Sequence, residues 1–541
     1  MTEEKYVLIL GAGLMQRPSI EAAWELGYKT LAVDANPKAL CAGFADKFEQ
    51  IDLKDKEKIA DFALSIKEKI AAVFTAGTDF STSVSYVAQK LGLPSHCYEA
   101  AEKASNKILM RKCFKQAGVP SPEFQQISRS QIAGFLEFNV LDSMTFPKVV
   151  KPVDNMGARG CRLIRSKKEF LPAIEDAVRY SRTGCAILED FMEGPEYSID
   201  ALVHNGTLTI TGFADRHIFF QPYFIELGHT IPSSADEKIK LELIEAFAKG
   251  VKALGLTEGA AKADIKYTSK GPMIGEIAAR LSGGYMSGWT YPYASNLNLT
   301  KQALLIALGK SPEQLMNHRV PLPVKNVSLE VYDYPCRSTC AERAWISIPG
   351  VVKSVTGGAN AYGFPFVKNV IYRSSKGDQV DFPRNNVEKC GNVISQSQQR
   401  ELAVKAAQKG IARMIVRLEP DNPKTQSYIQ RQEEKSEQGF PFSAYEFSQE
   451  LKDAVSSFAS EKKKFNTKEK LSLIMPEQLK NLLLTPVDFN CRSAFFSVEL
   501  FEEYVELEVE LDTLEFFNVL ERAGLQGILY IADTKALNGK S

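Results

Sequence analysis

The sequence predicts a multidomain fold with α/β and α+β parts, and three observations carry this prediction. A continuous apolar run over 6–10 leads into Gly11-Ala12-Gly13 and then an amphipathic helix, an order typical of a doubly wound parallel sheet. A mixed order of strands and helices follows up to about residue 420. Beyond Pro420 the composition becomes polar and charged over 424–470, and hydrophobic residues return over 471–541.

Length, charge and cysteine content narrow the class of protein. The 541 residues allow several domains of about 100–200 residues each. Lys+Arg and Asp+Glu both total 66, which argues against a mainly electrostatic nucleic-acid binder. No apolar run approaches the ~20 residues that cross a bilayer, and the acidic start lacks the basic flank of a signal peptide. We therefore expect a cytoplasmic protein without a nucleic-acid or membrane partner.

The nine cysteines contain no CxxC pair, and the chain has only five histidines. A structural zinc site is usually built from closely spaced cysteines and histidines. The cysteines are therefore expected to be reduced thiols, as is usual in the cytoplasm.

The N-terminal part of the chain reads as alternating strands and helices. Apolar strands are predicted at 6–10, 30–33 and 71–75, with helices after Pro18 and over 82–91. This order predicts a parallel sheet with helical crossovers up to about residue 95.

The glycine turn after the first strand matches part of a dinucleotide-binding fingerprint. Gly11 and Gly13 are present, but the position of the third glycine holds Gln16. Asp34, at the end of the second strand, could hold a ribose hydroxyl. The turn predicts either a dinucleotide-dependent oxidoreductase or a Rossmann-like half-domain that binds no dinucleotide.

A lysine and a glycine-containing loop follow an apolar strand in the centre of the chain. Lys151 lies near the end of the run over 146–152, and the loop over 154–160 follows directly after Val153. Its small residues are Gly157, Ala158 and Gly160. Such a loop lets backbone N–H groups close over phosphates, while lysine supplies a point charge. The segment predicts a phosphate-binding loop, although this combination is also common elsewhere.

Two carboxylates flank the next connector. Glu189 ends a strand and Glu196 follows seven positions later. An exposed strand end can present backbone groups to a planar base, and a carboxylate can accept from ribose hydroxyls. The alternative is a solvated acidic turn.

Two neighbouring strands carry a further acidic pair. Asp264 and Glu276 are twelve positions apart, a spacing at which a hairpin could place their carboxylates side by side. Arg280 follows four positions after Glu276. Two carboxylates together with phosphate oxygens suit Mg²⁺, which keeps several waters. The arginine could stabilise phosphoryl charge. The alternative is a surface cluster of ion pairs.

Taken in order, these motifs resemble the ATP-grasp superfamily. The resemblance covers about 1–420 and is greatest to the branch of carbamoyl-phosphate synthase large chain, biotin carboxylase and amino-acid ligases. It implies a Rossmann-like pre-ATP-grasp domain over 1–97, a two-lobed ATP-grasp domain over 98–315 and a small α+β lid-like domain over 316–420. Residues 421–541 are left as a polar linker with an appended helical or mixed region.

The resemblance also implies roles for individual residues. Lys107 and Lys151 would contact ATP phosphates, under a lid formed by the loop that contains Gly157, Ala158 and Gly160. Glu189 and Phe191 would face adenine, and Glu196 would hold the ribose.

Asp264 and Glu276 would be the metal ligands by the same resemblance. The usual pattern E-x-N-x-R reads here as Glu276-Ile277-Ala278-Ala279-Arg280, so the asparagine oxygen is missing. This departure leaves open whether one or two metal ions bind.

The run from Ile225 to Ser233 is similar to the E-x-G-H-x-x-P-S run of the amino-acid ligase branch. Glu226 and His229 are therefore expected to line the substrate site, with Arg216 and Trp289 as further wall candidates. The alternatives are a polar turn, a surface arginine and a core tryptophan.

These roles predict an ATP-dependent carboxylate–amine ligase. ATP would activate a small carboxylate as an acyl phosphate, and an amine or similar nucleophile would then attack. Lys151 and Arg280 would be the catalytic residues, and Arg280 would also contact substrate. The cofactors would be ATP and Mg²⁺, which Mn²⁺ could replace, and a homodimer fits the resemblance. The alternatives are an ATP-binding regulatory protein with weakened catalysis and an NAD(P)-dependent oxidoreductase.

Overall fold

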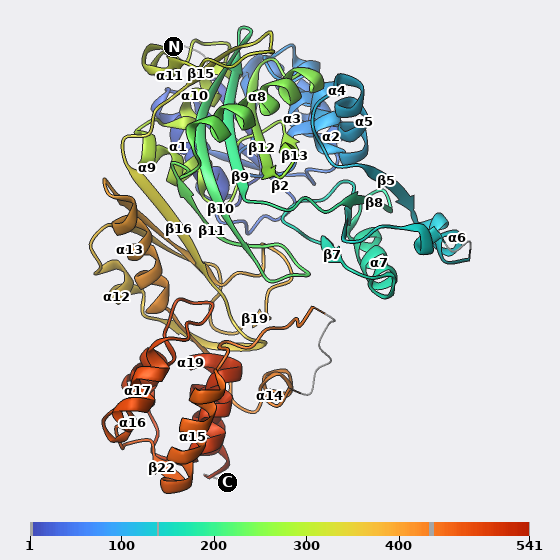
Figure 1. The fold of residues 1–541 in the computed structure, drawn as a ribbon. Helices are drawn as coiled ribbons and strands as arrows, with labels where there is room; N and C mark the ends of the chain where they lie inside the picture. The colour runs from blue at the N-terminus through green and yellow to red at the C-terminus, as the bar shows by residue number, and fades with distance from the viewer. Residues whose placement is uncertain (1–3, 138–139, 432–437, 540–541) are drawn as a thin grey trace. The chain divides into compact units, whose positions relative to one another are not determined.

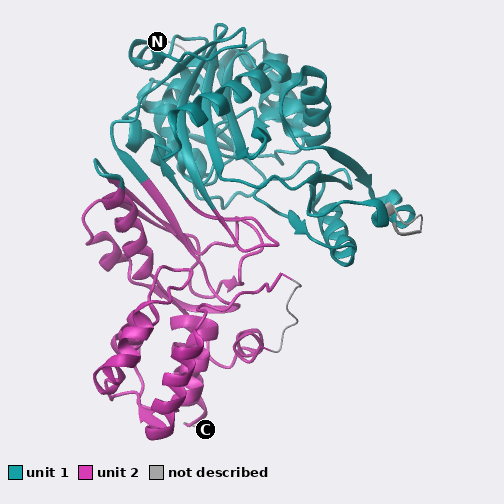
Figure 2. Ribbon diagram, viewed as in Figure 1, with its two compact units in different colours: residues 1–217, 229–340, 397–400 teal, residues 218–228, 341–396, 401–541 magenta. Residues whose placement is uncertain are grey.

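The computed structural model describes residues 4–137, 140–431 and 438–539 (Figure 1). The chain forms two compact units, each described by itself below (Figure 2). Unit 1 contains residues 1–217, 229–340 and 397–400, and unit 2 contains residues 218–228, 341–396 and 401–541. The boundaries fall inside β10 (Thr207–Phe219), β11 (Ile225–Ile231), β16 (Thr339–Trp345), β20 (Gly391–Ser397) and α13 (Arg400–Ala412), so these elements contribute residues to both units.

Unit 1 begins with a parallel sheet of order β3-β2-β1-β4. Its strands are β1 (Tyr6–Leu10), β2 (Lys29–Asp34), β3 (Lys47–Gln50) and β4 (Ile70–Phe74). The helices of this part are α1 (Arg17–Glu25), α2 (Lys56–Ser65) and α3 (Ser81–Leu91). Every residue of β1 is buried, as expected for a parallel strand covered on both faces. The predicted parallel sheet is confirmed.

A second sheet of unit 1 is antiparallel, with the order β5-β8-β6-β7. It consists of β5 (Phe124–Ser128), β8 (Cys185–Asp190), β6 (Lys148–Pro152) and β7 (Arg162–Ile164). Helix α7 (Phe170–Tyr180) packs on it through Phe170, Ile174 and Ala177. This sheet places Lys151 and Glu189 on adjacent strands.

The third sheet part of unit 1 has the order β13-β12-β9-β10 and is antiparallel throughout. Its strands are β9 (Glu196–His204), β10, β12 (Gly259–Thr268) and β13 (Gly271–Ala278). Helices α5 (Lys107–Ala117) and α8 (Glu237–Leu254) share a core with it, in which Phe114 and Phe247 meet Ile265 and Ile277. The opposite face of β9, β12 and β13 is therefore left to carry polar side chains.

Helices α4 (Tyr98–Ser105), α6 (Ile132–Glu137), α9 (Tyr291–Ser295), α10 (Leu299–Ala307) and α11 (Glu313–His318) complete the α-helices of unit 1 among the described residues. The short strands β14 (Val320–Pro321) and β15 (Glu330–Asp333) pair with each other, and β15 also pairs with the start of β10.

Unit 2 combines part of a ten-stranded sheet and a three-stranded sheet with a helical C-terminal region. The first sheet part has the order β16-β20-β18, with β20 (Gly391–Ser397) and β18 (Val367–Tyr372). The second has the order β19-β17-β21, with β19 (Gln379–Val380), β17 (Gly350–Thr356) and β21 (Ile415–Leu418). Helices α12 (Gly358–Tyr362) and α13 (Arg400–Ala412) accompany these strands.

The C-terminal region is built from six helices among the described residues. They are α14 (Pro423–Ile429), α15 (Gln449–Glu461), α16 (Leu471–Ile474), α17 (Glu477–Leu484), α18 (Ala494–Tyr504) and α19 (Thr513–Asn538), with a short β22–β23 ribbon (Lys464–Asn466 and Glu510–Asp512). One apolar core joins this region to the sheets of unit 2, for example through Trp345, Val416, Phe458 and Phe516. The division of the chain at 97, 315 and 420 stays a prediction.

Two side-chain amides of the C-terminal region bond to the backbone just after β16 and to the backbone of β21. The Asn490 amide accepts from the Ile346 N–H at 2.9 Å and donates to the Ile346 carbonyl at 3.1 Å. The Gln526 amide accepts from the Ile348 N–H at 3.2 Å and donates to the Val416 carbonyl at 3.1 Å. Buried backbone groups need such partners, so the amides complete the hydrogen bonding of this part of unit 2.

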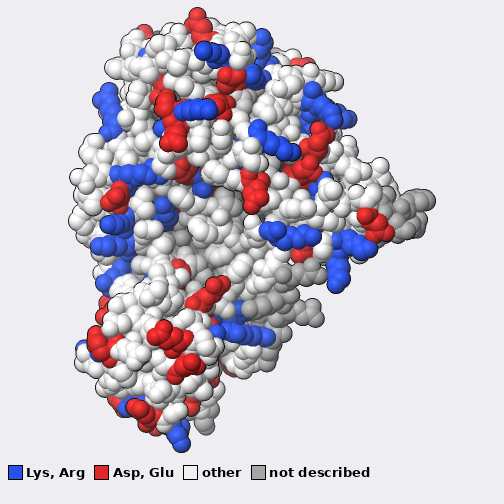
Figure 3. All heavy atoms as spheres, in the orientation of Figure 1, with Lys and Arg blue, Asp and Glu red and all other residues white. Residues whose placement is uncertain are grey.

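Positive and negative side chains are interspersed over the face shown in Figure 3, in keeping with the equal totals of the two signs. No helix within residues 4–137, 140–431 and 438–539 combines the length and the apolar character needed to span a membrane. All nine cysteines are free thiols.

Candidate nucleotide and acyl-transfer site

The acidic pair predicted from the sequence lies on one β-hairpin. Asp264 on β12 is the direct cross-strand partner of Glu276 on β13. Side chains at such positions lie close together on one face of the sheet. The hairpin therefore brings the two carboxylates together.

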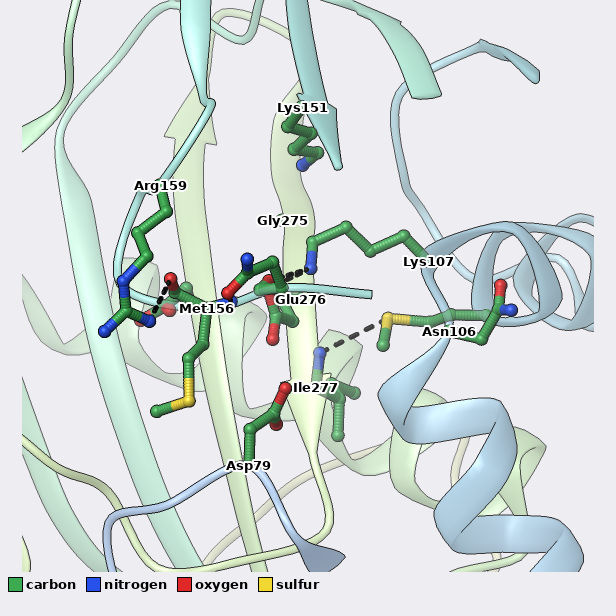
Figure 4. A network of polar contacts seen from close by, with 12 residues as sticks. Asp79, Asn106, Lys107, Lys151, Met156, Arg159, Gly275, Glu276 and Ile277 are labelled. Atoms are coloured by element: carbon green, nitrogen blue, oxygen red, sulfur yellow. Dashed lines mark hydrogen bonds and ion pairs between the residues drawn. The ribbon is translucent and has the colours of Figure 1, made fainter. Parts of the chain in front are cut away.

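Cations surround this acidic pair. Lys107, at the start of α5, places its Nζ 3.4 Å from Glu276 Oε2 and donates to the Asn155 carbonyl at 3.0 Å. Asp264 pairs with Lys262 Nζ at 2.5 Å through Oδ2 and with Arg216 Nη1 at 2.7 Å through Oδ1. Lys107, Lys151 and Asp79 extend toward Glu276 from three different elements (Figure 4).

The positive surroundings fix the charge of Glu276. Burial alone would raise its pKa, but the charges of Lys107, Lys262, Lys151 and Arg280 lower the pKa to about 2. Burial likewise opposes the charge of Lys107, and the carboxylates of Glu276 and Asp79 outweigh it, so the pKa of Lys107 is raised. Both groups are charged at neutral pH.

Lys151 is held by a buried carboxylate. Its Nζ lies 2.6 Å from Glu189 Oε2, and Arg111 Nε lies 2.7 Å from Glu189 Oε1. Glu189 is 2% exposed, and although burial raises its pKa, Arg111 and Lys151 lower it overall. Glu189 thus anchors Lys151, the candidate for phosphate binding. The predicted contact of Glu189 with adenine stays a prediction.

Arg111 was not singled out from the sequence. It is fully buried, and besides Glu189 its Nη2 donates to the Gly275 carbonyl at 2.6 Å. It therefore links β8 to β13, next to Glu276. Its place four residues after Lys107 on α5 is the signal that could have identified it, because such residues share a helix face.

The connector after β8 lies against the end of β12. The Phe191 N–H donates to the Pro147 carbonyl at 3.4 Å, and Lys266 Nζ lies 5.1 Å from the centre of the Phe191 ring. Gly194 has a φ of 140°, and a Cβ there would come within 2.1 Å of the Tyr267 carbonyl oxygen. This close approach requires glycine.

Glu196 begins β9 and faces two cations. Its Oε1 lies 2.5 Å from Arg216 Nη1, and its Oε2 lies 3.4 Å from Lys266 Nζ. Arg216 thereby connects the predicted ribose carboxylate with Asp264, which places both predicted roles in one polar network.

The loop between β6 and β7 is anchored at its base. The Asp154 carboxylate accepts from the Arg182 and Thr183 N–H groups, both at 2.9 Å, and from the Ser181 hydroxyl at 2.8 Å. The tip then turns through left-handed backbone at Gly157, Ala158 and Gly160, with φ values of 68°, 59° and 66°.

Arg280 follows β13 and lies beside the N-terminal part of unit 1. Its Nε lies 3.9 Å from Asp79 Oδ1, and its Nη1 donates to the Leu281 carbonyl at 3.1 Å. Asp79, in the loop after β4, is a second residue that sequence reasoning missed, because no local motif links it to a strand two hundred residues away.

The structure places Glu226 and His229 in different units. Glu226 lies in unit 2, where its N–H donates to Asn386 Oδ1 at 2.8 Å and its carbonyl accepts from Lys389 Nζ at 2.9 Å. His229 lies in unit 1, fully buried, with Nε2 2.7 Å from the hydroxyl of Thr290. Trp289, the neighbour of Thr290, packs edge-on against Tyr285. Their roles as substrate contacts stay predictions.

The glycine turn after β1 is filled by the chain itself. The side chain of Gln16 packs over Gly11 and donates to the Ala76 carbonyl at 2.7 Å. Asp34 accepts from the Ala12 N–H at 2.9 Å instead of presenting both oxygens to a ribose. These contacts give no support to the oxidoreductase alternative.

The acidic pair fits a divalent cation. Glu276 is ionised at neutral pH and stands opposite Asp264, and carboxylate oxygens are the ligands that Mg²⁺ prefers. Within the described parts of the chain, no group of three or more histidine, cysteine or acidic side chains could hold a metal. A cation here would therefore complete its shell with phosphate oxygens and water.

Comparison with known proteins gives two family matches. Residues 144–288 match the ATP-grasp domain, and residues 344–419 match the L-amino acid ligase C-terminal domain 2. The chain is 24% identical to carnosine synthase 1 of Gallus gallus over 338 residues, which are 58% of this chain and 36% of that protein. It is 22% identical to carnosine synthase 1 of Homo sapiens over 336 residues, 58% of this chain and 40% of that protein. The chain thus spans less than half the length of these relatives.

Two solved structures share the fold. The L-amino acid ligase from Bacillus licheniformis superposes with a TM-score of 0.65 and 18% identity, over 77% of this chain and 100% of that chain. The biotin carboxylase domain of the Hydrogenobacter thermophilus 2-oxoglutarate carboxylase, solved with MgADP and bicarbonate, gives a TM-score of 0.57 and 18% identity over 77% and 91%. At these identities the likeness establishes the fold.

Proposed function

We propose that this chain, which carries an ATP-grasp domain, is an ATP-dependent ligase that joins a small carboxylate to an amine. The observation that carries the proposal is the cross-strand pair of Asp264 and Glu276 with Lys107 and Lys262 against it. Lys151 lies on the facing strand β6, oriented toward the same space. This set combines carboxylates for a cation with ammonium groups for phosphates.

The chemistry follows from the weak electrophilicity of a carboxylate. The substrate carboxylate attacks the γ-phosphorus of ATP, which forms an acyl phosphate and releases ADP. The amine then attacks the acyl carbon, loses a proton and expels phosphate, leaving an amide. Positioning and charge neutralisation supply most of the catalysis of such transfers.

Each residue of the site has a separate role in this chemistry. Lys107 and Lys151 bind phosphate oxygens, and Glu189 keeps Lys151 aimed because it is itself held by Arg111. Asp264 and Glu276 would hold Mg²⁺, or Mn²⁺ in its place, which neutralises phosphate charge when bound. Arg280 stabilises the charge of the acyl phosphate and of the tetrahedral oxyanion. The loop over 154–160 covers the phosphates and keeps water away.

The substrate class is proposed from the relatives. The chain is similar to carnosine synthases and shares its fold with an L-amino acid ligase, so an amino acid is the first carboxylate or amine to test. Glu226 and His229 are proposed to contact it. The cytoplasmic location and a homodimer stay predictions.

A phosphate-release screen tests the proposal. The purified chain is mixed with ATP, Mg²⁺ and pairs of amino acids or small carboxylates, and substrate-dependent phosphate and ADP are measured. Lys151→Ala and Glu276→Ala should each lower turnover by about 100-fold or more. Each variant loses a preorganised charged side chain that stabilises the transition state. Lys270→Ala, on the exposed turn of the same hairpin, is the matched control and should keep wild-type turnover. Unchanged turnover in Lys151→Ala or Glu276→Ala would contradict the assignment.

The alternative of a catalytically weakened ATP-binding protein rests on Ala278 in place of the usual asparagine. The same screen separates the two functions. Nucleotide binding without phosphate release for any substrate pair would favour the regulatory alternative.

A further inference from the structure

We propose that the ammonium group of Lys262 takes the place of a second divalent cation in the nucleotide site, so that the chain binds one metal ion per nucleotide. This inference rests on the proposed function and names a phosphate-binding residue that the sequence motifs did not include. It follows from three observations on strands β9, β12 and β13.

The first observation is the register of the hairpin. Lys262 and Asp264 are two residues apart on β12, so their side chains share the face that also carries Glu276. Lys262 stands directly opposite Ala278 on β13. Side chains at directly opposite positions share one face, so the small methyl group of Ala278 leaves the lysine more room than an asparagine there would.

The second observation is the contact that Lys262 makes. Its Nζ lies 2.5 Å from Asp264 Oδ2, and its side chain is only 13% exposed. The ammonium thus occupies one oxygen of the acidic pair from within the sheet face. Its charge also contributes to keeping Glu276 ionised.

The third observation concerns what else could hold a cation. Lys262 pairs across β9 with Asp200, which is buried and accepts from the Ser282 N–H at 3.1 Å. The face therefore offers Asp264 and Glu276 to a metal, and both oxygens of Asp264 already face positive charges, Oδ2 that of Lys262 and Oδ1 that of Arg216. A second divalent cation at Oδ2 would be repelled by the ammonium group of Lys262. A lysine here supplies positive charge to phosphate oxygens directly.

The decisive experiment counts metal ions in the wild-type chain. Mn²⁺ is titrated into protein saturated with β,γ-imido-ATP, and free Mn²⁺ is measured by electron paramagnetic resonance. One bound Mn²⁺ per chain is expected, and two would overturn the inference while leaving nucleotide binding intact. No nucleotide binding at all would overturn the proposed function and this inference with it, which separates the two failures.

Substitutions test the role of the lysine itself. Lys262→Met should weaken binding of β,γ-imido-ATP by about 10-fold or more, because a charge-assisted hydrogen bond is lost. Lys262→Arg should retain affinity within about 3-fold, and Lys270→Met on the exposed turn is the matched control. Equal affinity in Lys262→Met and Lys270→Met would overturn the inference.

A gain of metal binding completes the test. In Lys262→Met combined with Ala278→Asn, the positive charge at Asp264 Oδ2 is removed and an amide oxygen is added on the same face. A second Mn²⁺ is then expected in the same titration. Retention of a single Mn²⁺ would show that Lys262 is not what excludes the second ion, and would overturn the inference. Circular dichroism confirms that each variant is folded before the titrations.

Discussion

Arg111 shows how a single buried side chain can set the geometry of a reactive group that it does not touch. It contacts Glu189 and the Gly275 carbonyl, and Glu189 in turn contacts Lys151. A buried ion pair contributes little over an apolar substitute, but the loss of one partner leaves an uncompensated charge.

Arg111→Met should therefore lower the free energy of unfolding by about 3–5 kcal/mol, because Glu189 keeps only Lys151. Urea denaturation followed by circular dichroism measures this loss. Lys115→Met, on the same helix but in an exposed pair with Glu123, should cost less than about 1 kcal/mol. Comparable losses in the two variants would contradict the account.

His96 is a second buried residue whose hydrogen bonds have a measurable effect, here on how stability depends on pH. Its Nδ1 accepts from the Thr257 and Glu258 N–H groups at 3.1 and 3.2 Å, and its Nε2 donates to the Ala260 carbonyl at 2.9 Å. This set requires the neutral ring, because a protonated Nδ1 could not accept. Burial lowers the pKa of His96 from 6.5 to about 4.

Because the pKa is lower in the folded chain, the unfolded chain binds more protons between these values. The stabilisation is complete above about pH 6.5 and is lost as the pH falls to about 4, a change of about 3 kcal/mol. The raised pKa values of Asp200 and Asp333, both about 6, act in the opposite direction. The test is the difference in unfolding free energy between wild type and His96→Gln across pH 4–8, which cancels the carboxylates. A pH-independent difference, or an equal pH dependence for the exposed His318→Gln, would refute the role.

At the scale of elements, the conformation of the loop over 154–160 depends on how closely its end packs on helix α7. Gly160 has a φ of 66°, and a Cβ there would lie 3.0 Å from Tyr180 and 3.2 Å from Ala177. Gly184, in the turn before β8, has a φ of 67° and open space around it. The two glycines share a backbone conformation and differ in crowding.

Gly184→Ala should cost about 1 kcal/mol of unfolding free energy, the cost of left-handed backbone alone. Gly160→Ala should cost more than this by about 1 kcal/mol or more, because the helix must also shift. Denaturant unfolding of both variants gives the comparison. If both variants lose the same free energy, the loop end does not pack on the helix as described.

Elements with a clear period could be read from the sequence. The five buried residues of β1 form one apolar run, and the helix predicted near 241–254 is the C-terminal part of α8. The composition over 424–470 predicts a solvated helix and linker, because the charged residues of helix α15 mask Leu451, Val455 and Phe458, which are spaced for one buried face.

The candidate site divides in the same way. Asp264 and Glu276 could be paired from the sequence because a hairpin relates them by local spacing. Arg111 and Asp79 could not, because their partners Glu189 and Arg280 lie far along the chain and only the tertiary fold brings them close. Lys262 carried a local signal, two residues before Asp264, but neither spacing nor motif shows where its ammonium group lies.

At the scale of the whole molecule, unit 2 is stabilised by polar links between its sheets and its last helix. Arg417 on β21 is buried, and its Nε and Nη2 lie 2.7 and 2.6 Å from the two oxygens of Asp533 on α19. Asp533 and Glu506 raise the pKa of Arg417 through hydrogen bonds and charge. The C-terminal region therefore contributes to the stability of residues 344–419, through the link between β21 and α19.

Asp533→Ala should lower the free energy of unfolding of unit 2 by about 3 kcal/mol or more, because it leaves Arg417 buried without its paired carboxylate. Glu506→Ala removes the other carboxylate that contacts Arg417, at 2.8 Å, but from an exposed position. That variant should cost less than about 1 kcal/mol. Thermal unfolding followed by tryptophan fluorescence can compare them, since Trp345 lies in the core of unit 2. An equal response would mean that burial does not govern the link.

The amides of Asn490 and Gln526 constrain how this chain could be recombined with others. They satisfy main-chain groups at Ile346, Ile348 and Val416 that a sheet would normally serve with another strand. A hybrid that exchanged residues 438–539 for a foreign segment of equal hydrophobicity would leave these buried groups without hydrogen-bond partners. Domain shuffling at this junction can succeed only if the incoming segment brings its own donors and acceptors to the same three places.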